Sequence, residues 1–287
     1  MTNTRYPVLL EVENVTCGYG SKQVACGISF TIDRGEILCL VGPNGVGKTT
    51  LFKTILRLLP LRKGRIRITG EDVSDIPRKR FASIVSYVPQ AHIPPFPFTV
   101  CDVVVMGRLC RIDSFRSPTE RDEAAAKRAL DRLSVLHLAG RAYTELSGGE
   151  RQLVLIARSL AQEPKIMVMD EPTSNLDFGN QLAVMEHVRS LARDSGIGVL
   201  MTSHDPNHAL VYSTKAAAMS RNGAFAVGPP ETVVTEQYLL DTYGVESRMF
   251  HLSTFEGDRA FACLPRAWGV PAEEMILPED SPAERRS

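Results

Sequence analysis

The chain has 287 residues, enough for one large domain or for one domain with an inserted lobe. Its composition is 44 % hydrophobic and 23 % charged with a formal net charge of zero, which argues against a global basic field for holding nucleic acid. The six scattered cysteines form no C-x-x-C pair, which disfavours disulfides and structural zinc and favours a reducing cytosol, and without a run of about eighteen apolar residues no membrane-spanning helix is expected.

The first part of the chain predicts strands that lead into a glycine-rich loop. Segments 9–19, 24–33 and 35–42 have the alternation or the β-branched content of strands, with glycines between them. The third segment is the most uniformly apolar, as expected of a strand that is buried on both faces of a sheet. The loop at 42–50 (GPNGVGKTT) follows directly, and a helix is predicted from there to Pro60.

The middle of the chain changes from strand-like to helical patterns. Residues 64–89 again look strand-like and end at Gln90. The proline-rich segment 93–100 (IPPFPFTV) is typical of neither a regular helix nor a central strand. Apolar positions at helical spacing then predict a helix over 118–138.

Strands and helices alternate again from Lys165 onward. An apolar strand is predicted at 165–170, a helix at 181–194, and a second apolar strand at 196–204. This rhythm of strand, helix and strand indicates an α/β fold with a mostly parallel sheet.

These elements divide the chain into a nucleotide-binding core, an inserted lobe and an extension. The α/β core is discontinuous and comprises residues 1–90 and 164–245. The helical lobe spans 91–163 and carries a second glycine turn, LSGGE. Residues 246–287 are expected to form a C-terminal extension with a hairpin that turns at 256–258 and a disordered polar tail.

The glycine-rich loop contains the residue types that a triphosphate site needs. Its glycines allow backbone conformations in which successive N–H groups converge on phosphates at a helix N-terminus. Lys48 would place a positive charge between the β- and γ-phosphates, and the Thr49 hydroxyl would ligate Mg²⁺. The residues predicted to bind the nucleotide here are Gly42, Pro43, Asn44, Gly45, Gly47, Lys48, Thr49 and Thr50.

Polar residues end the predicted strands, at the sheet edge where open α/β folds bind ligands. Asp170 can hold Mg²⁺, often through water, and Glu171 can polarise an attacking water as a general base. His204 can bond a γ-phosphate or be an ordinary strand-end residue. Gln90 can sense Mg²⁺ or water, or cap a turn. Tyr19 can stack on a purine or be an ordinary aromatic in an exposed turn. The residues alone leave both interpretations of the last three open.

The LSGGE turn at 146–150 opens a helix and thus offers a second phosphate-binding surface. One nucleotide needs only one cradle, and the loop at 42–50 already provides it. The spare turn is best explained if the ATP of a second copy uses it. The sequence therefore predicts an ATP-driven dimer.

Taken together, these motifs resemble the ATP-binding cassette family, the nucleotide-binding subunits of ABC transporters, over roughly residues 8–245. In chain order the sequence has the adenine-stacking aromatic, Walker A, the Q-loop, the signature, Walker B, the D-loop and the switch histidine. The matching positions, in the same order, are Tyr19, 42–50, Gln90, 147–150, 170–171, 174–177 (SNLD) and His204.

The resemblance implies a RecA-like P-loop core with an N-terminal antiparallel sheet and a head-to-tail dimer that holds two ATP molecules. Each ATP would lie on the P-loop of one subunit and be covered by Ser147 and Gly149 of the other, with the D-loop residue Asp177 also at the nucleotide. Two departures, Glu150 where Gln is commoner and Val46 where a small residue is usual, remove no phosphate ligand.

The same resemblance assigns roles in ATP hydrolysis. The residues expected to take part in catalysis are Glu171, His204, Gln90 and Lys48. The residues expected to ligate Mg²⁺ are Thr49, Gln90 and Asp170. Because Glu171 is present, the site is expected to be an active ATP hydrolase.

Four strings resemble the importer branch for metal chelates, which takes up iron–siderophore complexes, haem, cobalamin and, in some members, molybdate or tungstate. They are 99–108, 176–181, 203–209 and 228–245. This implies a peripheral protein on the cytoplasmic face of the membrane, bound to permease subunits and through them to an extracytoplasmic binding protein. The apolar segment IPPFPF (93–98) falls where the family docks its permease.

Three other classes of protein stay open at this stage. A cytosolic ATPase of the same family without a transport role, such as an iron–sulfur assembly protein, is disfavoured by the importer-like strings. An exporter subunit is the second, and a P-loop kinase, which would have no use for the LSGGE turn, is the third. The cargo is selected by the permease and the binding protein, and this chain does not name it.

Overall fold

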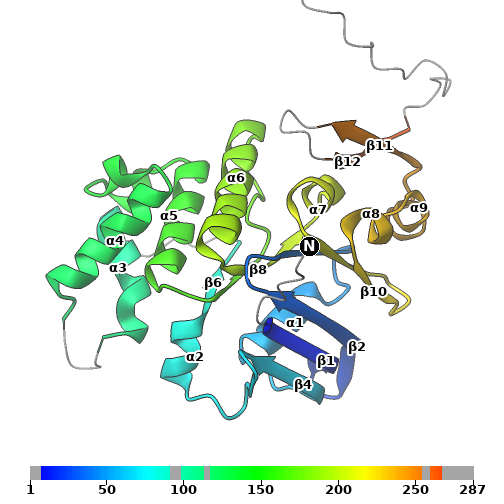
Figure 1. The fold of residues 1–287 in the computed structure, drawn as a ribbon, viewed down its shortest axis with the longest axis horizontal. Coiled ribbons are helices and arrows are strands. Elements are labelled where there is room, and N and C mark those ends of the chain that lie inside the picture. Colours follow the sequence, from blue (N-terminus) through cyan, green and yellow to red (C-terminus); the bar gives the residue numbers. More distant parts are fainter. Residues whose placement is uncertain (1–7, 91–97, 113–116, 254–258, 267–287) are drawn as a thin grey trace, which may run out of the picture.

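The computed structural model describes residues 8–90, 98–112, 117–253 and 259–266. Within these residues, the N-terminal region forms an antiparallel sheet with the strand order β2-β1-β4-β5 (Figure 1). Its strands are β1 (Val8–Tyr19), β2 (Lys22–Asp33), β4 (Lys63–Ile68) and β5 (Glu71–Asp72). Alternate side chains of β1, such as Leu10 and Val12, are buried, because one face of this sheet packs on the core.

The central sheet is mostly parallel and has the order β10-β9-β3-β8-β7-β6. Its strands are β3 (Ile37–Val41), β6 (Val85–Val88), β7 (Ile166–Met169), β8 (Gly198–Ser203), β9 (Lys215–Met219) and β10 (Phe225–Gly228). Only the β9–β10 pair is antiparallel among these neighbours. The side chains of β3, β7 and β8 are all buried, as expected of central strands covered on both faces. The predicted α/β fold with a mostly parallel sheet is confirmed.

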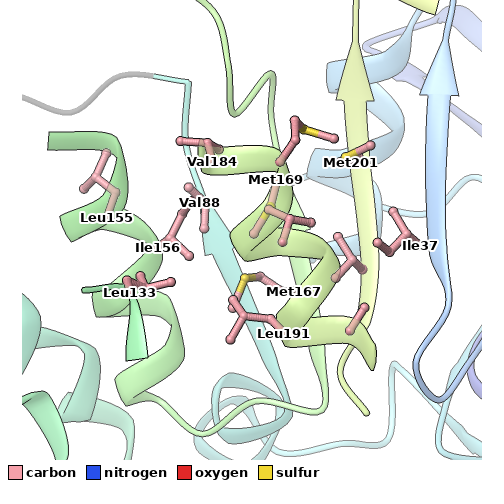
Figure 2. Close-up of a cluster of buried hydrophobic side chains, with 14 of the residues drawn as sticks. Ile37, Val88, Leu133, Leu155, Ile156, Met167, Met169, Val184, Leu191 and Met201 are labelled. Carbon is pink, nitrogen blue, oxygen red and sulfur yellow. The ribbon is translucent and has the colours of Figure 1, made fainter. Parts of the chain in front are cut away.

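One hydrophobic core contains side chains of this sheet and of the helices that precede and follow β7 in the chain. Figure 2 shows Met167 and Met169 of β7 beside Val184 and Leu191 of α6 (Phe178–Ser195), with Ile156 of α5 (Gly148–Ala161) next to them. All five side chains are at most 1 % exposed. Burying one such side chain is worth about 1.5–3 kcal/mol, so α5 and α6 are fixed rigidly to the sheet.

The helical lobe lies on the β6 side of the molecule and shares the same hydrophobic core (Figure 1). Besides α5, its helices are α3 (Val100–Val105), a 3₁₀ turn at Met106–Cys110, α4 (Glu120–Arg132) and short 3₁₀ turns at Leu136–Leu138 and Tyr143–Glu145. The buried Arg108 connects α4 and α5, since its guanidinium donates to Asp122 Oδ1 at 3.2 Å and to the Ala161 carbonyl at 2.8 Å. A paired buried charge of this kind fixes the helices relative to one another.

Three predicted elements differ from the structure. The helix predicted over 118–138 is shorter, because α4 ends at Arg132 and Ser134 adopts a left-handed φ of 60°. Helix α1 (Lys48–Ile55) ends before Pro60, because Arg57 adopts a left-handed φ of 60° and the N–H groups of the next two residues turn back to the Lys53 carbonyl. Residues Arg78–Ile84 form a helix, α2, where the sequence looked strand-like. Phe81 and Ile84 are buried at helical spacing, and only β6 beyond them is a strand.

The last described elements are helices and a small hairpin beside the central sheet. The helices are α7 (Pro206–Tyr212), α8 (Pro230–Val233) and α9 (Glu236–Tyr243), and the hairpin strands are β11 (Ser247–Ser253) and β12 (Arg259–Pro265). The two strands pair antiparallel, with Met249 opposite Cys263. The predicted turn at 256–258 and the tail beyond 266 lie outside the described residues. No helix in the described parts of the chain is long and apolar enough to cross a bilayer.

Candidate functional site

The glycine-rich loop connects the buried end of β3 to α1. At Gly42, with φ 155°, a Cβ would lie 2.6 Å from the Met219 carbonyl oxygen, so the loop can pass there only as glycine. Gly47 caps α1 at φ 114° without any side-chain cap. The first N–H groups of the helix are therefore available to an anion at its N-terminus.

Lys48 is folded inward over this loop. Its ammonium donates to the Gly42 carbonyl at 2.5 Å and to the Pro43 carbonyl at 3.1 Å. Burial lowers the pKa of Lys48, and the nearby carboxylates of Glu171 and Asp170 partly oppose that effect. The two carbonyl groups compensate the buried charge of the ammonium only in part. A triphosphate bound at the loop would provide an anionic partner for it.

Thr202 fixes the two acidic residues that follow β7. It is fully buried in β8, donates its hydroxyl to Asp170 Oδ1 at 2.9 Å, and accepts the Glu171 N–H at 2.9 Å. Glu171 has a left-handed φ of 49°, which is strained for a residue with a side chain. The hydrogen bond from its N–H to Thr202 holds the strained backbone in place. Sequence reasoning missed Thr202, and the only signal was a hydroxyl inside an apolar strand.

The Glu171 carboxylate is held between two neighbouring strand ends. Gln90, which follows β6, donates its amide to Glu171 Oε2 at 3.0 Å, and His204, which follows β8, contacts Oε1 through Nε2. The sheet order β8-β7-β6 explains this convergence, since the carboxyl ends of parallel neighbours share one edge. The structure thus brings together four residues that the sequence singled out separately: Gln90, Asp170, Glu171 and His204.

The donor set at this edge fits Mg²⁺ in the presence of a nucleotide. The Asp170 carboxylate, the Gln90 amide and the exposed Thr49 hydroxyl are hard oxygen donors of the kind that Mg²⁺ takes. Among the described residues, no cluster of three or more His, Cys, Asp or Glu side chains could hold a metal ion by itself. A bound Mg²⁺ would therefore complete its shell with water and phosphate oxygens, as in phosphoryl-transfer sites.

The LSGGE turn forms the N-terminus of α5. Ser147 is the N-cap: its hydroxyl accepts the Glu150 N–H at 3.3 Å, while Glu150 Oε2 accepts the Ser147 N–H at 2.7 Å. That backbone hydrogen bond to Ser147 lowers the pKa of Glu150. A Cβ on Gly149 would lie 2.4 Å from the Asn180 side chain, which Asp177 holds through its N-cap of α6. The turn is thus built with little tolerance for larger residues at Gly149.

The turn and the P-loop lie in different parts of the subunit, with α5 and α1 well apart in Figure 1. A cavity of about 300 Å³ adjoins the P-loop at Asn44, Gly45 and Val46, and neither Ser147 nor Gly149 lines it. Tyr19, at the end of β1, is 47 % exposed and is not part of that lining either. The described contacts therefore collect Gln90, Lys48, Asp170, Glu171 and His204 into one group and leave Tyr19, Ser147, Gly149 and Asp177 outside it.

We predict that Thr202→Val, which keeps the shape of the side chain, lowers kcat about tenfold and destabilises the fold by about 1–3 kcal/mol. Valine removes the donor to Asp170 and leaves the Glu171 N–H without its acceptor. The measurements are steady-state ATP hydrolysis and denaturant unfolding. An unchanged kcat would show that Thr202 does not set the geometry of the acidic pair.

The sequence is similar to those of known ABC transporter proteins. Residues 26–174 match the family model described as ABC transporter. An ABC transporter ATP-binding protein of Haemophilus influenzae is 39 % identical, covering 85 % of this chain and 92 % of its own. The molybdate import ATP-binding protein MolC of the same organism is 35 % identical, over 86 % and 90 %. The hemin import ATP-binding protein HmuV of Roseobacter denitrificans is 37 % identical, over 84 % and 92 %.

A solved structure extends this likeness to three dimensions. An inward-facing metal-chelate type ABC transporter contains a chain that aligns with this one at a TM-score of 0.80 and 31 % identity. The alignment covers 91 % of this chain and 98 % of that one.

Proposed function

The chain belongs to the family of ABC transporter ATP-binding proteins, which hydrolyse ATP, and we propose that it energises the uptake of a metal chelate. The cargo class is an iron–siderophore complex, haem, cobalamin, or molybdate or tungstate. The observation that carries this proposal is the likeness to a metal-chelate type transporter over 98 % of that protein's chain. The named importers of hemin and of molybdate among the relatives support the same cargo class.

At the nucleotide, the proposed mechanism assigns each converging residue one task. Lys48 and the N-terminus of α1 would bind the β- and γ-phosphates, and Thr49, Asp170 and Gln90 would hold Mg²⁺, which would neutralise phosphate charge. Glu171 polarises the attacking water as a general base. Its two oxygens are already oriented by Gln90 and His204, so the carboxylate needs little rearrangement on ATP binding.

The second phosphate-binding turn is proposed to act on a second copy of the chain. Helix α5 lies apart from α1 in Figure 1, and neither Ser147 nor Gly149 lines the cavity at the P-loop of its own subunit. In the proposed dimer, both residues would cover the ATP bound to the partner's P-loop. Asp177, which orders the start of α6 beside Gly149, would complete that surface. In such a dimer, ATP binding closes two composite sites and hydrolysis opens them, which biases the permease between two states.

The proposed partners follow from this mechanism. The dimer would bind permease subunits from the cytoplasmic face of the membrane, and the permease would receive cargo from an extracytoplasmic binding protein. The segment 93–98, where the sequence predicts permease docking, lies mostly outside the described residues. Docking there therefore stays a prediction.

Transport by the reconstituted complex tests the proposal. The chain, its permease and the binding protein are placed in proteoliposomes, and the uptake of a ferric siderophore, haem, cobalamin and molybdate is followed with ATP on the side of this subunit. We expect ATP-dependent uptake of one chelate class, and none in a complex carrying Glu171→Gln. ATP-dependent movement in the opposite direction would identify an exporter instead, and turnover without movement of any of these cargoes would reject the proposed cargo class.

A further inference from the structure

The C-terminal hairpin is bound to the helix that follows His204. Asn207 lies in the first turn of α7, three residues after His204. Its side-chain amide donates to the Cys263 carbonyl at 3.1 Å and accepts the Cys263 N–H at 2.8 Å. These two hydrogen bonds pair the Asn207 amide with the edge of β12 as a further backbone residue would pair.

The opposite edge of the hairpin is bound at the same register. Met249 of β11 pairs with Cys263, and its N–H donates to Glu236 Oε1 on α9 at 2.9 Å. Cys263 is buried, and Met249 and Phe261 pack against the hydrophobic core of the central sheet. The hairpin is thus fixed between α9 on one side and α7 on the other (Figure 1). Of these two helices, α7 is the one that follows His204 in the chain.

The loop between β8 and α7 is also held by contacts of Ser203 and His208. The Ser203 hydroxyl accepts the Asp205 N–H at 3.0 Å and lies 2.9 Å from His208 Nδ1. His208 Nδ1 also lies 3.5 Å from the Thr173 hydroxyl, just after Glu171, and burial lowers the pKa of His208, which favours its neutral ring. The first turn of α7 is therefore held on the Walker B side by His208 and on the hairpin side by Asn207.

His204 precedes this anchored turn and faces the space beside the hairpin. Its side chain is 41 % exposed and borders a mainly apolar cavity of about 260 Å³, whose other walls include Leu239, Tyr243, Cys263 and Pro265. The space between His204 and the hairpin is therefore open. Among the described residues, the side chain of Asn207 connects the hairpin to the backbone of α7 by two hydrogen bonds, and this backbone leads to His204.

We propose that the C-terminal hairpin, β11–β12, positions His204 for ATP hydrolysis through the paired hydrogen bonds between Asn207 and Cys263. Asn207 is then a positioning residue, since it touches neither nucleotide nor reacting water. This inference rests on the proposed role of His204 at Glu171. It makes the C-terminal extension part of the catalytic machinery, because a hairpin that leaves α7 removes one of the two anchors of the loop that carries His204.

Two full-length variants break the connection from its two sides. Asn207→Asp keeps the acceptor but places a carboxylate oxygen against the Cys263 carbonyl, and an acidic residue in the first turn leaves α7 itself favourable. Cys263→Pro removes the N–H that Asn207 accepts. That N–H points to Asn207 and away from β11, so the hairpin ladder keeps its hydrogen bonds.

We expect each variant to lower kcat about tenfold while the KM for ATP stays the same, because His204 acts on hydrolysis and not on nucleotide binding. The double variant is expected to be about as active as either single one, since both break one connection; independent effects would multiply to about a hundredfold. Asn14→Asp makes the same chemical change on an exposed residue of β1 and should leave kcat unchanged. Titration with a fluorescent ATP analogue gives the folded fraction, by which each kcat is corrected.

The His204→Ala background separates this inference from the proposed function. If His204→Ala lowers kcat and Asn207→Asp has no further effect in that background, Asn207 acts through His204. A wild-type kcat in Asn207→Asp, multiplying effects in the double variant, or a further loss beyond His204→Ala would overturn the inference alone. A wild-type kcat in His204→Ala would instead reject the role proposed for His204, and the inference with it.

Discussion

Glu171→Gln is expected to lower kcat about a thousandfold and to leave the protein as an ATP-bound dimer. The amide cannot take a proton from the attacking water, so hydrolysis stops after ATP has closed the two subunits together. The measurements are ATP turnover and the molecular mass in sizing chromatography with ATP, where the mass should double. Glu13→Gln, on the exposed face of β1, is the matched control and should behave as the wild type.

The dimer is expected to survive the Glu171→Gln change because the local geometry is retained. The amide oxygen of glutamine can still accept from Gln90 or His204, and the backbone bond from residue 171 to Thr202 does not involve the side chain. A variant that loses turnover but stays a monomer with ATP would contradict the proposed dimer mechanism. That result would leave an ATP hydrolase whose turnover does not depend on the proposed dimer.

Ser147→Arg is expected to lower kcat about a hundredfold or more while the monomer keeps its affinity for ATP. Ser147 is exposed at the start of α5, so arginine fits on the subunit's own surface but would fill the space of the partner's phosphates. The lost N-cap costs about 1 kcal/mol, too little to unfold the lobe. The measurements are ATP turnover and equilibrium binding of an ATP analogue to dilute protein.

The control for the Ser147→Arg variant is Glu150→Gln, which changes the same turn and keeps its cap. A glutamine oxygen can accept the Ser147 N–H as the Glu150 carboxylate does, so turnover should stay near that of the wild type. Weak ATP binding by the Ser147→Arg monomer would place the turn in its own subunit's site. That outcome would contradict the assignment of Ser147 to the partner's nucleotide.

Much of the fold could be predicted because local pattern and tertiary packing agree in the core. The apolar strands at β3, β7 and β8 are buried on both faces, and helices begin after β3 and β7 where the sequence predicts them. The predicted elements were wrong where one or two residues determine the local structure. A single left-handed residue, Arg57, ends α1, and the buried pair Phe81 and Ile84 makes a helix from a segment that looked like a strand.

The residues of the candidate site could be predicted where a sequence motif contains them. They could not be predicted where only a contact in the folded chain shows their role. The strand-end positions of Gln90, Glu171 and His204 pointed to one sheet edge, and the structure joins them there. Thr202 was missed because a threonine in an apolar strand is an ordinary strand residue until its partners are known. The pairing of Asn207 with Cys263 joins a helix to an edge strand 56 residues away, and no periodicity reports such a contact.

Mixing two inactive variants tests directly whether the LSGGE turn of one subunit completes the ATP site of another. Lys48→Ala has a defective P-loop and an intact turn, whereas Ser147→Arg has an intact P-loop and a defective turn. In a mixed dimer, one site combines the intact P-loop with the intact turn. An equimolar mixture is expected to regain about a quarter of wild-type turnover, since about half of the dimers are mixed and each has one working site of two. A mixture no more active than either variant alone would show that the turn does not act on the partner's ATP.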